Sequence, residues 1–76
     1  MKIVPIKEKT RFDVIKKIEE CLEMAKNGSY CNVAIVMVGD DHSVADCWAN
    51  GSFPYTMVGS LEHLKQEFMR SNIEER

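Results

Sequence analysis

Hydrophobic residues change their spacing along this chain in a way that separates four elements. Over residues 12–25 they recur at steps of three and four, which places them on one stripe of a helix. Residues 32–38 (NVAIVMV) are almost continuously apolar and residues 43–49 (SVADCWA) are mostly small, so both segments favour strands. Over residues 57–68 the helical steps return as a heptad-like seam. The pattern predicts an α+β fold of order α-β-β-α.

The ends of the first helix carry recognisable signals. Thr10, with Asp13 three residues later, is a variant of the capping box, so the helix is expected to begin near Phe12. Gly28, within Asn-Gly-Ser, favours a left-handed cap after the last turn.

Two further segments complete the expected order. Residues 1–6 (MKIVPI) fit either a short edge strand, in which Pro5 is tolerated, or an extended lead-in, which makes the order (β)-α-β-β-α. Residues 50–55 form a loop, after which Thr56 is the expected cap of the last helix.

The two strands are expected to pair as an antiparallel hairpin around a turn at residues 39–42 (GDDH), because Gly and Asp tolerate positive φ. Val33, Ile35 and Met37 point to one face of the first strand, and equally apolar residues point to the other. Both helices are expected to pack on one face of this hairpin sheet.

The second face of such a sheet would stay in water, and an isolated hairpin is marginal in stability. The simplest remedy is a homo-oligomer, a dimer or a higher assembly, and most simply a C2 dimer. The small residues of the second strand would let another backbone approach closely. The interface is expected to comprise Ala34, Val36, Val38, Ala45, Cys47 and Ala49.

Composition supports the same conclusion. The 76 residues are 45% hydrophobic and 29% charged, which predicts one small globular domain over residues 1–76. A core of this size supplies little stability, so such domains often rely on disulfides, a metal or self-association. The three cysteines are odd in number and contain no C-x-x-C pair, which argues against a disulfide scaffold or a zinc ribbon. Of these three sources of stability, self-association is the one that the sequence leaves open.

Charge and hydropathy exclude some partners. The net charge is −2, divided into +2 over residues 1–38 and −4 over residues 39–76. No basic stripe carries interleaved aromatics, so a nucleic-acid partner is not expected. No run reaches the roughly 18 apolar residues of a membrane span and no apolar signal core follows the first lysines, so a cytoplasmic protein without a membrane partner is expected.

Polar clusters give little support to catalysis. The acidic group around Asp40, Asp41 and His42, with Asp46 nearby, has the residue types of a metal site, but it also makes a good hairpin turn, and the turn is the preferred interpretation. Cys21, Cys31 and Cys47 are interpreted as small buried hydrophobes and His63 as an i,i+4 partner of Glu67 rather than a base. No enzyme activity, metal or cofactor is therefore expected.

The segment of residues 48–60 (WANGSFPYTMVGS) is the most suggestive of a ligand. It holds three aromatic residues and hydroxyl groups at the start of a helix, where free N–H groups favour an anion and aromatic rings stack on a base. The alternative is that these residues only cap the helix and close a small core. The candidate ligand-binding residues are Trp48, Asn50, Ser52, Tyr55, Thr56 and Ser60.

Three segments resemble short proteins encoded by phages and prophages: VAIVMVGDD (33–41), VADCWANGS (44–52) and MVGSLEHLKQEFM (57–69). The resemblance covers roughly the C-terminal half and is structural rather than catalytic. It implies a non-enzymatic accessory or anti-defence factor in the host cytoplasm that inhibits a host protein as a homo-oligomer. The alternative that it implies is an oligomer that sequesters a small signalling nucleotide of the cyclic or ADP-ribose type.

Overall fold

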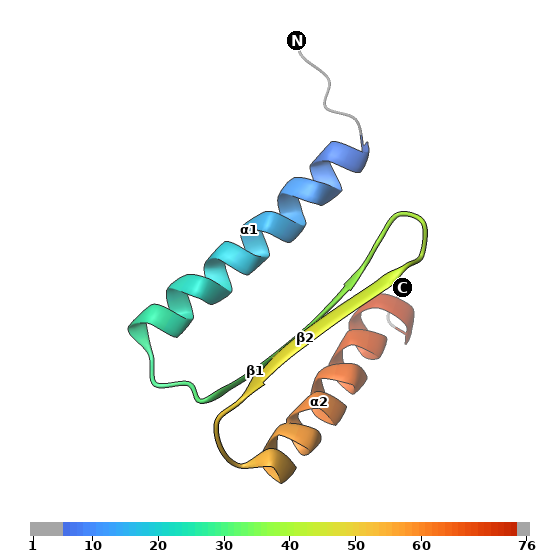
Figure 1. Cartoon of the computed structure of the whole chain (residues 1–76). Helices are drawn as coiled ribbons and strands as arrows, with labels where there is room; N and C mark the ends of the chain where they lie inside the picture. Colours follow the sequence, from blue (N-terminus) through green and yellow to red (C-terminus); the bar gives the residue numbers. More distant parts are fainter. Residues whose placement is uncertain (1–5, 75–76) are drawn as a thin grey trace. The chain divides into compact units, whose positions relative to one another are not determined.

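The computed structural model describes residues 6–74, which form an α+β fold of order α-β-β-α with a short π-helical turn after the last helix (Figure 1). The elements are α1 (Ile6–Asn27), β1 (Asn32–Val38), β2 (Val44–Asn50), α2 (Pro54–Met69) and η1 (Arg70–Glu74). The chain divides into two compact units, residues 1–30 and residues 31–76. The α+β prediction is confirmed, whereas the single domain over residues 1–76 stays a prediction.

α1 begins earlier than its capping signal predicted. It starts at Ile6 rather than near Phe12, so Thr10 lies inside the helix instead of capping it. Apart from Thr10, the charged segment ahead of the apolar stripe consists of residues that form helices readily, and Lys9 pairs with Asp13 one turn later (3.8 Å). The expected N-terminal strand covers residues 1–6. Residues 1–5 lie outside the described residues, and Ile6 is the first residue of α1.

α1 ends where the sequence predicted, but by a different mechanism. No glycine among the described residues has positive φ, so Gly28 does not form a left-handed cap. Instead the Asn27 Nδ2 donates to the Glu23 carbonyl (3.0 Å), so the Asn27 side chain bonds back onto the last turn of the helix. A Cβ on Gly28 would lie 2.5 Å from the Tyr30 ring and 3.1 Å from the Met24 carbonyl oxygen, so glycine fits a close approach here.

The hairpin differs from its prediction by one residue. β1 spans Asn32–Val38 as predicted, but β2 spans Val44–Asn50, one residue later than expected, because the turn has five residues (39–43) rather than four. Gly39 and Ser43 close this turn, with the Gly39 N–H donating to the Ser43 carbonyl (2.7 Å). The residue with positive φ is His42 (70°), not Gly39.

The added turn residue decides which side chains share a face. Directly opposite residues of an antiparallel pair lie on the same face. Ala34 is opposite Trp48 and Val36 opposite Asp46, whereas Ile35 is opposite Cys47. A shift of one residue in pairing moves a whole strand face to the other side of the sheet. The six predicted interface residues are therefore divided between the two faces.

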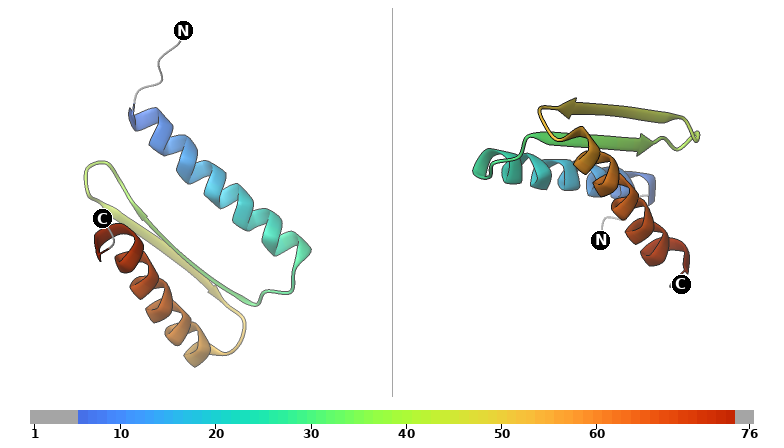
Figure 2. Two further views of the ribbon diagram at one scale, coloured as in Figure 1. Left: turned by 180° about the vertical axis from the view of Figure 1, so that it is seen from behind. Right: turned by 90° about the horizontal axis from the view of Figure 1, so that it is seen from below.

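α2 follows the hairpin within the second unit (Figure 1), and the right-hand view of Figure 2 shows it running obliquely away from the sheet toward its C-terminal end. It begins at Pro54 after Phe53, whose backbone is left-handed (φ 53°) and whose side chain makes no capping hydrogen bond. Thr56 lies inside the first turn, so its prediction as the cap is wrong. Proline takes the first helical position because its fixed φ suits a helix start and its missing N–H needs no partner there.

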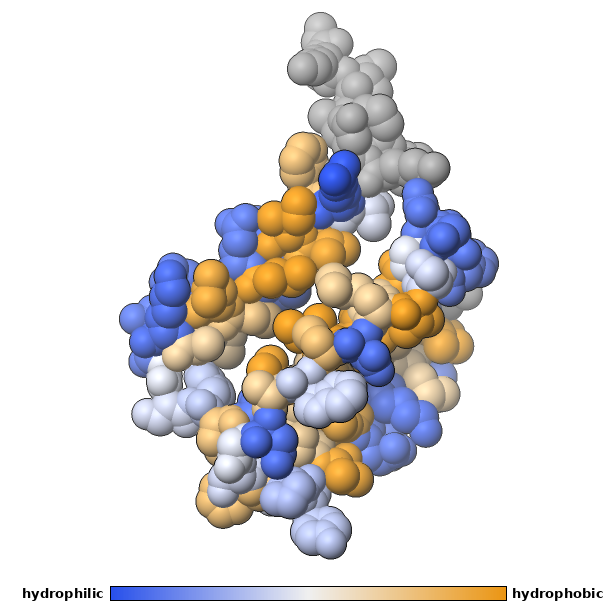
Figure 3. Space-filling model, in the orientation of Figure 1, coloured by the Kyte–Doolittle hydropathy of each residue, from blue (hydrophilic) through white to orange (hydrophobic). Residues whose placement is uncertain are grey.

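Apolar side chains lie on the visible surface of the described part of the chain (orange in Figure 3). None of the described side chains is buried. The α1 stripe illustrates this, because a single helix cannot bury its own apolar residues: Phe12 is 59% exposed and Ile18 is 41% exposed. None of the helices over residues 6–74 is both long and apolar enough to span a bilayer.

Candidate functional site

One face of the hairpin is apolar and largely exposed, and we call it the open face. It consists of three pairs of directly opposite residues, at positions 34 and 48, 36 and 46, and 38 and 44. On this face Val36, Val38 and Val44 are 66%, 67% and 66% exposed, and Trp48 is 73% exposed. The opposite face is more covered, with Val33 at 47% and Met37 at 40%. The open face comprises Ala34, Val36, Val38, Val44, Asp46 and Trp48.

The chemistry of the open face suits contact with another protein. Three valines and an indole ring present on the order of 500 Å² of apolar surface, the size of the largest patch on a typical monomer, which is often functional. Asp46 is its one charged group. Burial of such an area against a complementary surface would favour association, and the carboxylate would favour a partner that supplies a basic group or a hydrogen-bond donor.

A side-chain clasp holds the end of the hairpin that carries Trp48. The Asn32 Oδ1 accepts hydrogen bonds from the N–H groups of Gly51 (2.8 Å) and Ser52 (3.1 Å), and its Nδ2 donates to the Ser52 carbonyl. The Gly51 N–H also lies 2.9 Å from the Cys31 carbonyl oxygen. These bonds fix where β2 leaves the sheet.

The acidic turn at the other end of the hairpin is held by its own side chains. The Asp41 Oδ1 accepts a hydrogen bond from the Ser43 N–H (3.0 Å). Hydrogen bonds from the Ser43 side chain and backbone stabilise the carboxylate and lower the pKa of Asp41. Among the described residues no three His, Cys, Asp or Glu side chains lie together as a metal site would require.

The predicted ligand residues fall in three places. Trp48 lies on the open face, and Asn50 ends β2 on the same side of the strand. Ser52 is held through its backbone by Asn32, and the Ser60 hydroxyl donates to the carbonyl of Thr56 (2.8 Å) within α2.

Of the two aromatic residues of this predicted set, Tyr55 is the more exposed. It is 90% exposed in the first turn of α2. The structure brings Asn50 and Ser52 to the Asn32 clasp, but it does not gather all six side chains around one cavity.

Sequence reasoning missed Val44 and Asp46 as members of the open face. Both follow from the pairing register, which depends on the number of residues in the turn. The only signal in the sequence was the Asp-x-Ser spacing of Asp41 and Ser43, which favours a longer, side-chain-bonded turn.

The cysteines do not fill the role predicted for them. Cys21, Cys31 and Cys47 are free thiols and all three are exposed rather than buried. Cys47 lies on the more covered face of the hairpin, opposite Ile35, and His63 lies on α2.

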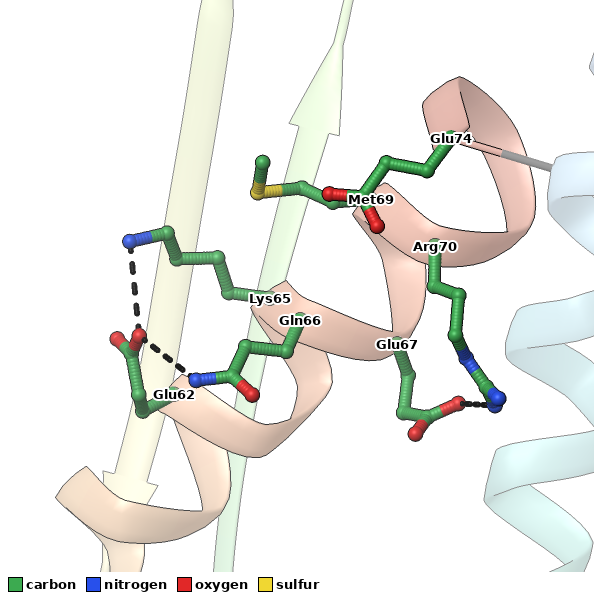
Figure 4. Close-up of a pocket in the computed structure, with 7 residues that line it drawn as sticks. All are labelled: Glu62, Lys65, Gln66, Glu67, Met69, Arg70 and Glu74. Carbon is green, nitrogen blue, oxygen red and sulfur yellow. Dashed lines mark hydrogen bonds and ion pairs between the residues drawn. The ribbon is translucent and has the colours of Figure 1, made fainter.

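A hollow of about 480 Å³ lies on the surface of α2 and η1 (Figure 4). Four of its charged groups already pair along the helix: Lys65 with Glu62 (3.6 Å), and Arg70 with Glu67. These pairs are exposed and contribute little to stability. The lining residues are Glu62, Lys65, Gln66, Glu67, Met69, Arg70 and Glu74.

Comparisons of the chain with protein-family models, with curated proteins and with solved structures found no match.

Proposed function

We propose that this chain is a non-enzymatic binding protein that assembles as a homo-oligomer and inhibits a host protein, as an accessory or anti-defence factor of a phage. The observation that carries the binding role is the open face, where four large apolar side chains are each about two-thirds or more exposed. A contiguous apolar surface of this size on a small domain marks an interaction site. The phage origin and the host target rest on the resemblance of the C-terminal half.

Two matched valines test whether the open face binds a protein. Val44 on the open face and Val58 on α2 are 66% and 64% exposed, so Val44→Asp and Val58→Asp add the same charge at similar accessibility. The tagged chain is used to retain proteins from a bacterial lysate, and the retained protein is purified and titrated against each variant. We expect Val44→Asp to weaken binding at least about tenfold, because it buries an unpaired carboxylate in the contact.

Val58→Asp is expected to bind the purified partner as the unmodified chain does. Equal affinity of Val44→Asp and the unmodified chain would place the contact elsewhere. Retention of no protein by the unmodified chain would contradict the proposal.

A second candidate is capture of a small signalling nucleotide by the oligomer. It is favoured by the exposure of two aromatic rings, Trp48 and Tyr55, on either side of the loop between β2 and α2, because exposed rings can stack on a base. Trp48 is the one tryptophan of the chain, so its fluorescence reports binding directly. Titration with cyclic dinucleotides and ADP-ribose derivatives should quench it, and an unchanged spectrum across this panel would contradict the candidate.

A further inference from the structure

The hydrogen bonds at the two ends of the hairpin show which backbone groups face outward. The Gly39 N–H donates to the Ser43 carbonyl (2.7 Å), and the Gly51 N–H donates to the Cys31 carbonyl (2.9 Å). Both pairs continue the register of the hairpin, so they belong to its hydrogen-bonded class. In an antiparallel ladder this class alternates with pairs whose N–H and C=O groups point away from the partner strand.

The alternation places one row of backbone donors and acceptors along each outer edge. Over the described residues the sheet has only these two strands, so neither row pairs with a further strand there. The outward groups belong to Asn32, Ala34, Val36 and Val38 on β1, and to Val44, Asp46, Trp48 and Asn50 on β2.

The residues of β1 have none of the sequence features that block pairing with another strand. Protected edges carry a charge, a proline or a bulge, or are very short. β1 has seven residues, NVAIVMV, with no charged residue and no proline, and it pairs with β2 without a bulge. β2 carries a carboxylate, Asp46, at the middle of its edge. The two edges therefore differ in their capacity to accept a further strand.

We infer that β1 pairs antiparallel with β1 of a second copy of this chain, giving a four-stranded sheet of order β2-β1-β1-β2 about a two-fold axis. This inference rests on the homo-oligomer of the proposed function and specifies its interface. With full overlap, Ile35 lies opposite Ile35 of the second copy, Ala34 opposite Val36, and Val33 opposite Met37. All these cross-strand pairs are apolar, and such pairs stabilise a sheet.

Charge favours β1 over β2 as the shared edge. Full antiparallel overlap of two β2 strands would centre on Cys47, and it would place the two Asp46 carboxylates diagonally across one face, where like charges repel. Pairing through β1 brings no charged side chain to the axis.

The amount of contact also fits a stable dimer. Full overlap forms about eight new backbone hydrogen bonds, close to the roughly ten direct hydrogen bonds of a typical interface. It also raises the sheet from two strands, which are marginal alone, to four. The two open faces become one continuous surface, with Trp48 and Val36 of each copy on the same side of the sheet.

Proline substitution tests the edge without disrupting the hairpin. Val36 and Asp46 are opposite each other, and both direct their N–H outward, so Val36→Pro and Asp46→Pro each remove a donor that the β1–β2 ladder does not use. By light scattering after size-exclusion chromatography, we expect Val36→Pro to run at the mass of one chain, 8.7 kDa, and Asp46→Pro at twice that mass. A Val36→Pro protein that is still dimeric would overturn the β1 edge, whereas an unmodified protein that is monomeric would overturn the proposed oligomer itself.

Cysteine cross-linking tests the register and does not depend on the proline variants folding. In a chain whose three cysteines are replaced by serine, Ile35→Cys places two thiols opposite each other across the axis, at a Cβ separation close to that of a disulfide. Val33→Cys lies on the same face, but its thiol faces position 37 of the second copy, four residues along the strand from the second copy's own thiol. Oxidation with diamide should link Ile35→Cys into a covalent dimer and leave Val33→Cys largely unlinked. Equal linking of both variants, or no linking of Ile35→Cys, would overturn the pairing.

Discussion

Asn32 is the side chain on which the exit from β2 depends. It makes three hydrogen bonds to the backbone of Gly51 and Ser52. We expect Asn32→Ala to lower the free energy of unfolding by about 1–2 kcal/mol, because it removes three hydrogen bonds between the start of β1 and the residues that follow β2. Urea denaturation measures this, with Asn72→Ala as the control, because Asn72 makes one hydrogen bond, to the Phe68 carbonyl (2.9 Å). Equal losses for the two variants would show that the clasp has no special role.

Asp41 should make the hairpin turn sensitive to acid. Hydrogen bonds from Ser43 lower its pKa in the folded chain, so the folded state binds the proton less tightly than the unfolded state. Its contribution to stability is therefore complete above the unfolded pKa, near pH 4, and is lost as the pH falls through the lower folded pKa. NMR shifts of the turn amides from pH 6 to pH 2 should follow this titration. In Asp41→Asn the same shifts should be absent, and their persistence would assign them to another group.

Two glycines of the second unit should respond in opposite ways to alanine. A Cβ on Gly51 would lie 2.7 Å from the Cys31 carbonyl oxygen, a backbone atom that cannot move without shifting the end of β1. A Cβ on Gly59 meets nothing within 4 Å, so no close approach requires glycine at this position of α2. We expect Gly51→Ala to destabilise the hairpin and Gly59→Ala to stabilise α2 by about 0.5–1 kcal/mol. Thermal unfolding of both variants measures the difference, and a shift of the same sign in both would contradict it.

At the scale of elements, periodicity located the helices and strands better than it located their first residues. The continuous apolar run fixed β1 at Asn32–Val38, because no helical or loop pattern competes with it. The start of α1 was misplaced because Thr10 has the residue type of a cap although its neighbours are good helix formers. The predicted start of α2 at Thr56 is wrong because Pro54 takes the first helical position, where its fixed φ suits a helix start.

The sides of the sheet were the least predictable feature of the candidate site. Each strand taken alone shows which residues alternate, but not which face of β1 lies beside which face of β2. That depends on whether the turn closes after four residues or five, and here the Asp41–Ser43 hydrogen bond accompanies the longer turn. Trp48, predicted as a binding residue, lies on the open face. The predicted interface residues of β1 lie there too, whereas those of β2 (Ala45, Cys47 and Ala49) lie on the other face, because the prediction used the shorter turn.

The entry to α2 contains a strained residue that can be relieved. Phe53 has φ 53° and ψ 59°, a left-handed conformation that costs an L-residue roughly 1–2 kcal/mol. Its side chain is 66% exposed, so little packing is lost on its removal. We expect Phe53→Gly to raise stability by about 0.5–1 kcal/mol after the greater freedom of glycine in the unfolded chain is counted. Urea denaturation measures the change, and a clear loss of stability would mean that the Phe53 ring is buried in the assembled protein.

At the scale of the whole molecule, the lack of buried side chains among the described residues is the feature that most needs an explanation. Apolar burial is the dominant favourable contribution to folding, and a two-stranded sheet gains little of it alone. Self-association through β1 supplies two further strands to the sheet, and small domains often rely on such association for stability.

The native mass of the unmodified chain in solution tests this account most directly. We expect light scattering after size-exclusion chromatography to give twice 8.7 kDa or a higher multiple, with the mass falling only on strong dilution. A well-folded species of 8.7 kDa at every concentration would contradict self-association.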